Sequence, residues 1–183
     1  MVIVLIVMSL TALLAPSAVR AFAIFRAQSA SLEILRMARI ARREAMEGGR
    51  AIVVRAVGGR VEVRRGATNL CRTSNWAAQF ADACATAADL SNAGTSCLGY
   101  VDPTMFSVGS HSVTITPLDG QDICYQPNGE GFLAPSGGTV FTRSPAGGLD
   151  AIRFEVRRLE GGSSIDPVRT IIFPVDSSPR SVR

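Results

Sequence analysis

The chain contains no lysine and a single histidine, and these two absences remove several kinds of catalytic or metal site. All 19 basic residues among the 183 are arginine. A phosphate-binding Gly-Lys-Ser/Thr loop is therefore absent, and one histidine is too few for a His-Glu-x-x-His helix or a histidine-containing zinc cluster. No nucleophile-elbow motif occurs either. We expect a protein that is not an enzyme and that needs no cofactor, metal or small-molecule substrate.

The few residues that could still carry chemistry have simpler interpretations. His111 stands in an alternating segment, 106–115, which predicts an exposed strand position. Asp119, Asp122 and Glu130 stand in predicted turns, where carboxylates usually solvate loops or close Asx turns. A calcium site built on the two aspartates would match no recognised loop spacing. The catalytic and metal-ligating sets are therefore expected to be empty.

Four cysteines, at Cys71, Cys84, Cys97 and Cys124, indicate an oxidising compartment. No pair has the two-residue spacing of a zinc knuckle or a redox motif. Four cysteines allow three disulfide connectivities, and buried free thiols are the alternative. Because cysteines that are neighbours along a loop meet most easily, we predict the pairs Cys71–Cys84 and Cys97–Cys124.

The net charge of +4 and the pI of about 9.3 are basic without being extreme. The arginines are scattered, and the two densest groups lie on a predicted helix and a predicted hairpin: Arg36, Arg39, Arg42 and Arg43, then Arg60, Arg64 and Arg65. No dense basic block with interleaved aromatic residues occurs, so solvated faces are expected rather than a nucleic-acid footprint.

Residues 1–19 form the one long apolar run, MVIVLIVMSLTALLAPSAV, and carry no charge. As a helix this run is about 28 Å long, close to the hydrocarbon thickness of a bilayer. Pro16 stands inside it and is expected to kink or locally melt the helix. We predict a membrane anchor that includes Met1, Leu5, Leu14 and Pro16.

The helical pattern continues past the apolar run. Phe22, Phe25, Leu32 and Leu35 follow at helical spacings, with charges on the other faces, and a glycine pair at 48–49 ends the pattern. The prediction is one helix of about 45 residues, which cannot bury its own first half. These four side chains are expected to pack against neighbouring helices. A cleaved signal peptide with a mature start near Phe22 is the alternative.

Three stretches carry a resemblance to a known superfamily. The helix end ARREA at 41–45 is followed by a glycine turn and a strand, ICYQPNGEGF spans 123–132, and Pro16 follows a long apolar run. Together they resemble the type IV pilin superfamily, within it the minor pilin and pseudopilin branch that includes FimT, FimU and GspH. The resemblance implies an α+β, pilin-like fold: a long N-terminal helix with antiparallel β-sheets packed on its C-terminal half.

The resemblance also implies a function. It points to a structural minor pilin of a type IV pilus that joins or primes the filament, its tip complex included, with other pilins and the inner membrane as partners. The head would lie in the periplasm, or at the cell surface once assembled. Alternatives are a GspH-like pseudopilin of a type II secretion system, or a DNA-uptake pilin. The compact basic motif expected of the DNA-uptake type is reduced here to Arg180 and Arg183.

One part of the superfamily pattern is missing. A basic leader ending in glycine, an N-terminal Phe and a nearby Glu do not occur, and alignment on Pro16 puts that Glu ahead of Met1. We expect the natural chain to begin upstream of Met1; the alternative is a protein that lacks the processing motif.

After the helix the hydrophobic period changes to 2, which predicts a β-rich head over 50–176 following the anchor and amphipathic helix of 1–49. Residues 51–65 predict a hairpin about Gly58-Gly59, with Val61 and Val63 inward and Arg60, Glu62 and Arg64 in water. Residues 66–103 are predicted to be irregular, apart from a short helix within 75–90 over Trp76 and Phe80. Later strands are expected at 105–117, 122–125, 131–134, 139–143, 151–158 and 168–175, and a disordered tail at 177–183.

Overall fold

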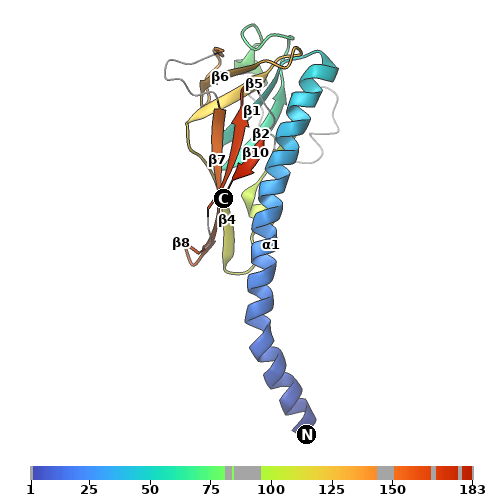
Figure 1. The fold of residues 1–183 in the computed structure, drawn as a ribbon, viewed down its shortest axis with the longest axis vertical. Coiled ribbons are helices and arrows are strands. Elements are labelled where there is room, and N and C mark those ends of the chain that lie inside the picture. The colour runs from blue at the N-terminus through green and yellow to red at the C-terminus, as the bar shows by residue number, and fades with distance from the viewer. Residues whose placement is uncertain are drawn as a thin grey trace.

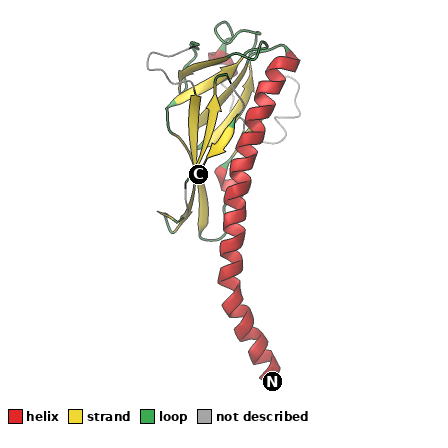
Figure 2. Cartoon of the chain, viewed as in Figure 1, coloured by secondary structure: helices red, strands yellow, loops and turns green. Residues whose placement is uncertain are grey.

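The chain is α+β, with one long helix and two antiparallel sheets (Figures 1 and 2). This computed structural model describes residues 2–80, 84, 96–143, 151–165, 168–176 and 179–182, with side chains of the first helix from Ser17 onward. The helices are α1 (Val2–Gly48), α2 (Trp76–Gln79) and a 3₁₀ turn, η1 (Pro103–Phe106). The strands are β1 (Ile52–Val57), β2 (Arg60–Arg65), β3 (Cys97–Val101), β4 (His111–Pro117), β5 (Gln121–Tyr125), β6 (Gly131–Pro135), β7 (Ala151–Glu160), β8 (Ser163–Ser164), β9 (Arg169–Pro174) and β10 (Arg180–Val182).

The C-terminal half of α1 packs against the sheets through small side chains. Its buried residues are dominated by alanine: Ala23, Ala27, Ala30, Ala38, Ala41 and Ala45. Small residues let the helix axis approach the strands closely. At β3 the Met37 side chain fills the space over Gly99, where an added Cβ would stand 2.1 Å from Met37 Cε. The predicted packing of antiparallel sheets on this half of the helix is confirmed, and the N-terminal half extends beyond the head (Figure 1).

The first sheet has the order β3-β2-β1-β5-β6, and the second has the order β10-β9-β7-β4, with β8 paired to β7. The predicted hairpin at 51–65 is confirmed as β1 and β2, which pair from Ile52↔Arg65 to Val57↔Arg60. Gly58 and Gly59 have φ of 57° and 80°, a region that glycine enters at no steric cost. The predicted strands around 122–125, 131–134, 151–158 and 168–175 are confirmed as β5, β6, β7 and β9.

One hydrophobic core joins the inner faces of both sheets to α1. Val54, Val63 and Ile123 supply fully buried side chains from the first sheet. The second sheet supplies Phe154 and Phe173, whose rings meet edge-on at 5.1 Å. Since α1 contributes to the same cluster, the helix and the head share one core.

Several sequence-based boundaries were wrong because pairing partners are distant in sequence. β3 lies inside the segment that was predicted to be irregular, and it is held by β2. Residues 139–143 form only an isolated bridge, Leu133↔Thr142, instead of a strand. Residues 180–182 of the expected disordered tail form β10 against β9. Of the helix predicted within 75–90, the structure contains α2, and residues 81–83 and 85–90 lie outside the described part.

The outer face of the first sheet is buried, contrary to the expectation that it faces water. Glu62 is 3% exposed and Arg64 is 2% exposed. The chain after β2 folds back over this face, where Trp76 stacks on Phe80 at 5.6 Å and Arg55 lies 3.9 Å over the Phe80 ring. The alternation in β2 correctly predicted that Val61 and Val63 face the core. The covering segment has no hydrophobic periodicity from which its position over the sheet could have been predicted.

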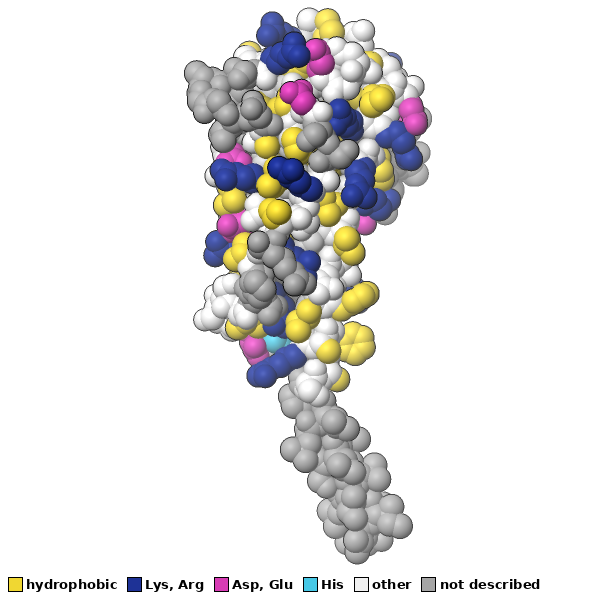
Figure 3. All heavy atoms as spheres, in the orientation of Figure 1, with side chains coloured by type: hydrophobic (Ala, Val, Ile, Leu, Met, Phe, Trp, Pro, Cys, Tyr) yellow, Lys and Arg dark blue, Asp and Glu magenta, His cyan; other side chains and the backbone are white. Residues whose placement is uncertain are grey.

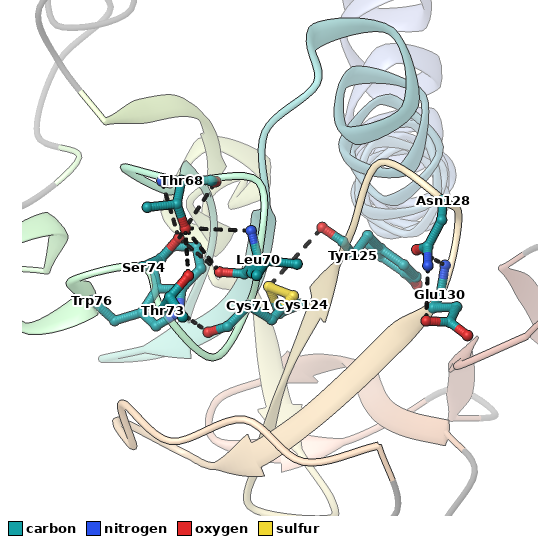
Figure 4. The surroundings of a disulfide bond; sticks show 10 residues. All are labelled: Thr68, Leu70, Cys71, Thr73, Ser74, Trp76, Cys124, Tyr125, Asn128 and Glu130. Atoms are coloured by element: carbon teal, nitrogen blue, oxygen red, sulfur yellow. Dashed lines mark hydrogen bonds between the residues drawn. A yellow bond between two sulfur atoms is a disulfide. The ribbon is translucent and has the colours of Figure 1, made fainter.

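The disulfides are Cys71–Cys124 and Cys84–Cys97, so the predicted pairing was wrong. Both bonds tie the covering segment to the first sheet, since Cys124 stands in β5 and Cys97 in β3. Cys71 and Cys124 lie with Trp76 in a second buried cluster on the outer face (Figure 4). Proximity along the chain was the wrong criterion, because the strand order decides which cysteines meet.

Candidate interaction surface on the long helix

α1 presents a continuous exposed face on the side away from the sheets. Residues spaced alternately by three and four positions form it, and we call this set the outer stripe: Phe22, Phe25, Ser29, Leu32, Arg36, Arg39, Arg43 and Met46. The buried alanine face lies opposite, because each residue turns an α-helix by about 100°. An apolar or charged row at this spacing is the geometry that helix–helix packing uses.

Three of the four residues predicted to pack against other helices lie on the outer stripe. Phe22 is 64% exposed, Phe25 is 65% and Leu32 is 66%. Leu35 instead is 7% exposed and belongs to the core of its own head. The reason is angular: Leu35 falls about 140° around the helix from Phe22, so it turns toward the sheets.

The predicted anchor falls on side chains outside the described part of the chain. The backbone of α1 is helical through Leu5, Leu14 and Pro16, so the proline does not interrupt the helix. Met1 itself is not described. Among the described residues, no helix has the length and hydropathy needed to cross a membrane.

The upper half of the outer stripe is cationic. In Figure 3 the exposed side chains over α1 change from hydrophobic near the base of the head to arginine higher up. Arg36 is bonded to Glu33 at 2.5 Å, and Arg43 is 3.8 Å from Glu47, both in exposed pairs. Arg39 has no carboxylate partner within the described residues. Exposed pairs of this kind contribute little stability.

The histidine and the carboxylates do not converge on one site. His111 was predicted to be exposed but is 4% exposed, with Nδ1 4.0 Å from Glu160 across the β4–β7 pair. Asp119 is bonded to Arg153, and Glu130 donates its backbone N–H to Asn128 in the predicted β5–β6 turn. No group of three or more metal-binding side chains occurs in the part of the chain that is described.

A buried row of alternating charge on the first sheet was not predicted. Asp122 of β5, Arg55 of β1 and Glu62 of β2 are neighbours across the strands, and Arg64 is bonded to Glu62. Asp122 was expected to be solvated in a turn but is fully buried, accepting from Gly137 N at 2.9 Å and Ala56 N at 3.4 Å. Arg42 and Arg60 are also engaged, by Gly129 O and by Asp102.

The buried position of Asp122 predicts a stability that falls as pH rises. Burial raises its pKa from 3.8 to about 6, against the opposing influence of the Gly137 N–H and the Arg55 charge. Its contribution is therefore fully present below pH 3.8 and lost as pH rises through about 6, which amounts to about 3 kcal/mol. In Asp122→Asn we expect that dependence to disappear, measured by urea unfolding across this range.

The contribution of Asp102 to stability has the opposite pH dependence. Burial, which raises its pKa, is outweighed by hydrogen bonds from Thr104 and the charge of Arg60, so its pKa is lowered. Its contribution is present above pH 3.8 and lost on acidification. An Asp122→Asn variant whose pH profile matches the parent would contradict the assignment to Asp122.

Comparisons with known proteins add no assignment. A scan against protein-family models and searches of curated proteins and of solved structures found no match. The functional conclusion therefore depends on the outer stripe and on the sequence of the N-terminal run.

Proposed function

We propose that the chain is a structural minor pilin of a type IV pilus, anchored in the inner membrane and joined to a filament through α1. The observation that carries the proposal is the division of α1. Its C-terminal half lies in the core of the head, while its N-terminal half extends beyond the head and carries no charge over residues 1–19. A helix of this kind needs an apolar environment that its own head cannot provide.

The exposed aromatic residues at the base of the head support an assembly role. Phe22, Phe25 and Leu32 are each about two-thirds exposed on one face. Fully burying such a side chain is worth about 1.5–3 kcal/mol, so three of them provide a substantial driving force for contact with neighbouring helices. A periplasmic head agrees with the two disulfides, since such bonds persist in oxidising compartments.

The test is photo-crosslinking in native membranes with the full chain. A photoreactive phenylalanine analogue at Phe22 or Phe25 is expected to capture other pilin-like subunits. Val140, which is 72% exposed on the head, is the matched control and should capture far less. A type II secretion pseudopilin would capture subunits of that system instead.

N-terminal mass spectrometry tests the anchor. A mature protein that retains residues 1–14 is the expected result. A mature terminus between Ala18 and Phe25 would mean a cleaved signal peptide, and the filament role would have to be abandoned.

A further inference from the structure

The outer stripe consists of two halves of different chemistry, and the second half restricts the partner. Phe22, Phe25 and Leu32 occupy the lower stripe positions, while Arg36, Arg39 and Arg43 occupy the next three. In a packed helix pair, these positions face the partner helix directly. A wholly apolar partner helix would therefore match the lower half of the stripe. In the upper half it would place an uncharged surface against the three arginines.

The cationic half is shaped to receive side chains. A groove of about 320 Å³ runs along it, with an apolar floor and arginine rims, lined by Leu32, Leu35, Arg36, Arg39, Ile40 and Arg43. A partner helix could place an apolar residue on the floor and carboxylates at the rims. The exposed pairs Arg36–Glu33 and Arg43–Glu47 can exchange their partners at small cost, and Arg39 has no carboxylate partner among the described residues.

A second copy of this chain does not satisfy the groove. Parallel pairing of two stripes sets Arg36, Arg39 and Arg43 against the same residues, and like charges in contact are unfavourable. In the described part of the head, four carboxylates are already paired with arginines: Asp102 with Arg60, Asp119 with Arg153, Glu130 with Arg143 and Glu155 with Arg157.

We propose that the outer stripe pairs with a parallel α-helix of a different subunit, which carries acidic residues opposite Arg36, Arg39 and Arg43. The inference rests on the proposed function, since the parallel orientation follows from two subunits anchored in one membrane. The aromatic half supplies contact area, and the arginine half selects an acidic partner and disfavours self-association.

The experiment measures binding of synthetic soluble helices to the full-length protein in detergent, by fluorescence anisotropy. One peptide presents Leu opposite Leu32 and Glu opposite the three arginines, and its matched control has Lys in place of Glu. The Glu peptide is expected to bind at least about tenfold more tightly, because three exposed ion pairs of ordinary strength amount to that ratio. The preference should weaken with salt.

Charge reversal isolates the stripe. The triple variant Arg36→Glu, Arg39→Glu and Arg43→Glu is expected to reverse the preference in favour of the Lys peptide. A triple variant with the same charge change outside the stripe should keep the original preference: Arg72→Glu, Arg143→Glu and Arg157→Glu. Circular dichroism of both variants checks that α1 is retained.

Four results would overturn the proposal. They are equal binding of the two peptides, an equal loss in the control variant, tighter binding of duplex DNA or anionic vesicles than of the Glu peptide, and crosslinks between two copies at Arg39. Failure here with subunit capture at Phe22 intact would reject only the acidic partner. Loss of capture at Phe22 would reject the proposed function itself.

Discussion

Replacing Arg64 with Met is expected to lower the free energy of unfolding by about 4 kcal/mol, because it removes the guanidinium that is hydrogen-bonded to the buried carboxylate of Glu62. Arg64 donates to Glu62 Oε2 through Nε at 3.0 Å and through Nη2 at 2.9 Å. Its Nη1 also donates to Gln79 O at 2.7 Å, which ties the covering segment to β2. One substitution therefore removes a buried pair and an anchor of the outer layer.

The chain provides a probe and a matched control for this measurement. Trp76, the only tryptophan, is 1% exposed beside this layer, so its fluorescence reports unfolding in urea. Arg157 and Glu155 form the same two-residue Arg–Glu pair on β7, but Arg157 is 43% exposed. Arg157→Met should cost less than about 1 kcal/mol.

A double variant distinguishes the buried charge from lost packing. Glu62→Met with Arg64→Met removes both charges and should recover most of the stability, since hydrophobic replacement of a buried pair is often neutral. If Arg64→Met costs no more than Arg157→Met, the outer face of the sheet is hydrated and the covering segment is not packed on it.

The sequence sufficed for elements whose causes are local. The β1–β2 hairpin follows from alternation on either side of two glycines, and the length of α1 follows from helical spacing and a glycine stop. The exposure of Phe22 and Phe25 could also be read from spacing. Leu35 was assigned to the same face although it stands about 140° away from Phe22, an angle that the sequence already contains.

The errors on the first sheet have one physical cause. The segment after β2 folds back onto the outer face of the first sheet, and it buries Glu62, Arg64 and both disulfides there. A strand that is covered on both faces should lack charged residues, so the charged residues of β2 predicted that its outer face is exposed to solvent. Arg64 and Glu62 compensate each other, and Arg64 also donates to the Gln79 carbonyl and the Ser96 hydroxyl. These tertiary contacts are not encoded in any local pattern.

The helical spacing of the arginines in the outer stripe could be predicted from the sequence, but their place on a partner-facing surface could not. Arg36, Arg39 and Arg43 have helical spacing, which predicts a shared face, and a solvated face was the reasonable expectation. Their alignment with Phe22, Phe25 and Leu32 matters only because the sheets occupy the opposite side of α1. The stripe is therefore a face of the helix that the head leaves open to a partner.

Removing the disulfide Cys71–Cys124 is expected to cost more stability than removing Cys84–Cys97. The two bonds close loops with sequence separations of 53 and 13, for which chain entropy gives about 4 and about 3 kcal/mol. The double serine variants, unfolded in urea with Trp76 as the probe, measure both values. Cys71→Ser with Cys124→Ser should also alter native Trp76 fluorescence, because the Cys71 carbonyl accepts from Trp76 Nε1 at 2.7 Å.

Peptide mapping under non-reducing conditions provides the independent check on this pairing. A peptide that links Cys71 to Cys124 is expected, whereas one that links Cys71 to Cys84 would mean that the covering segment is closed on itself. In that arrangement the segment would have no covalent tie to β5, and the larger of the two stability losses should then vanish. The order of the two losses therefore tests whether the outer layer is fastened across the sheet, as the burial of Arg64 and Glu62 requires.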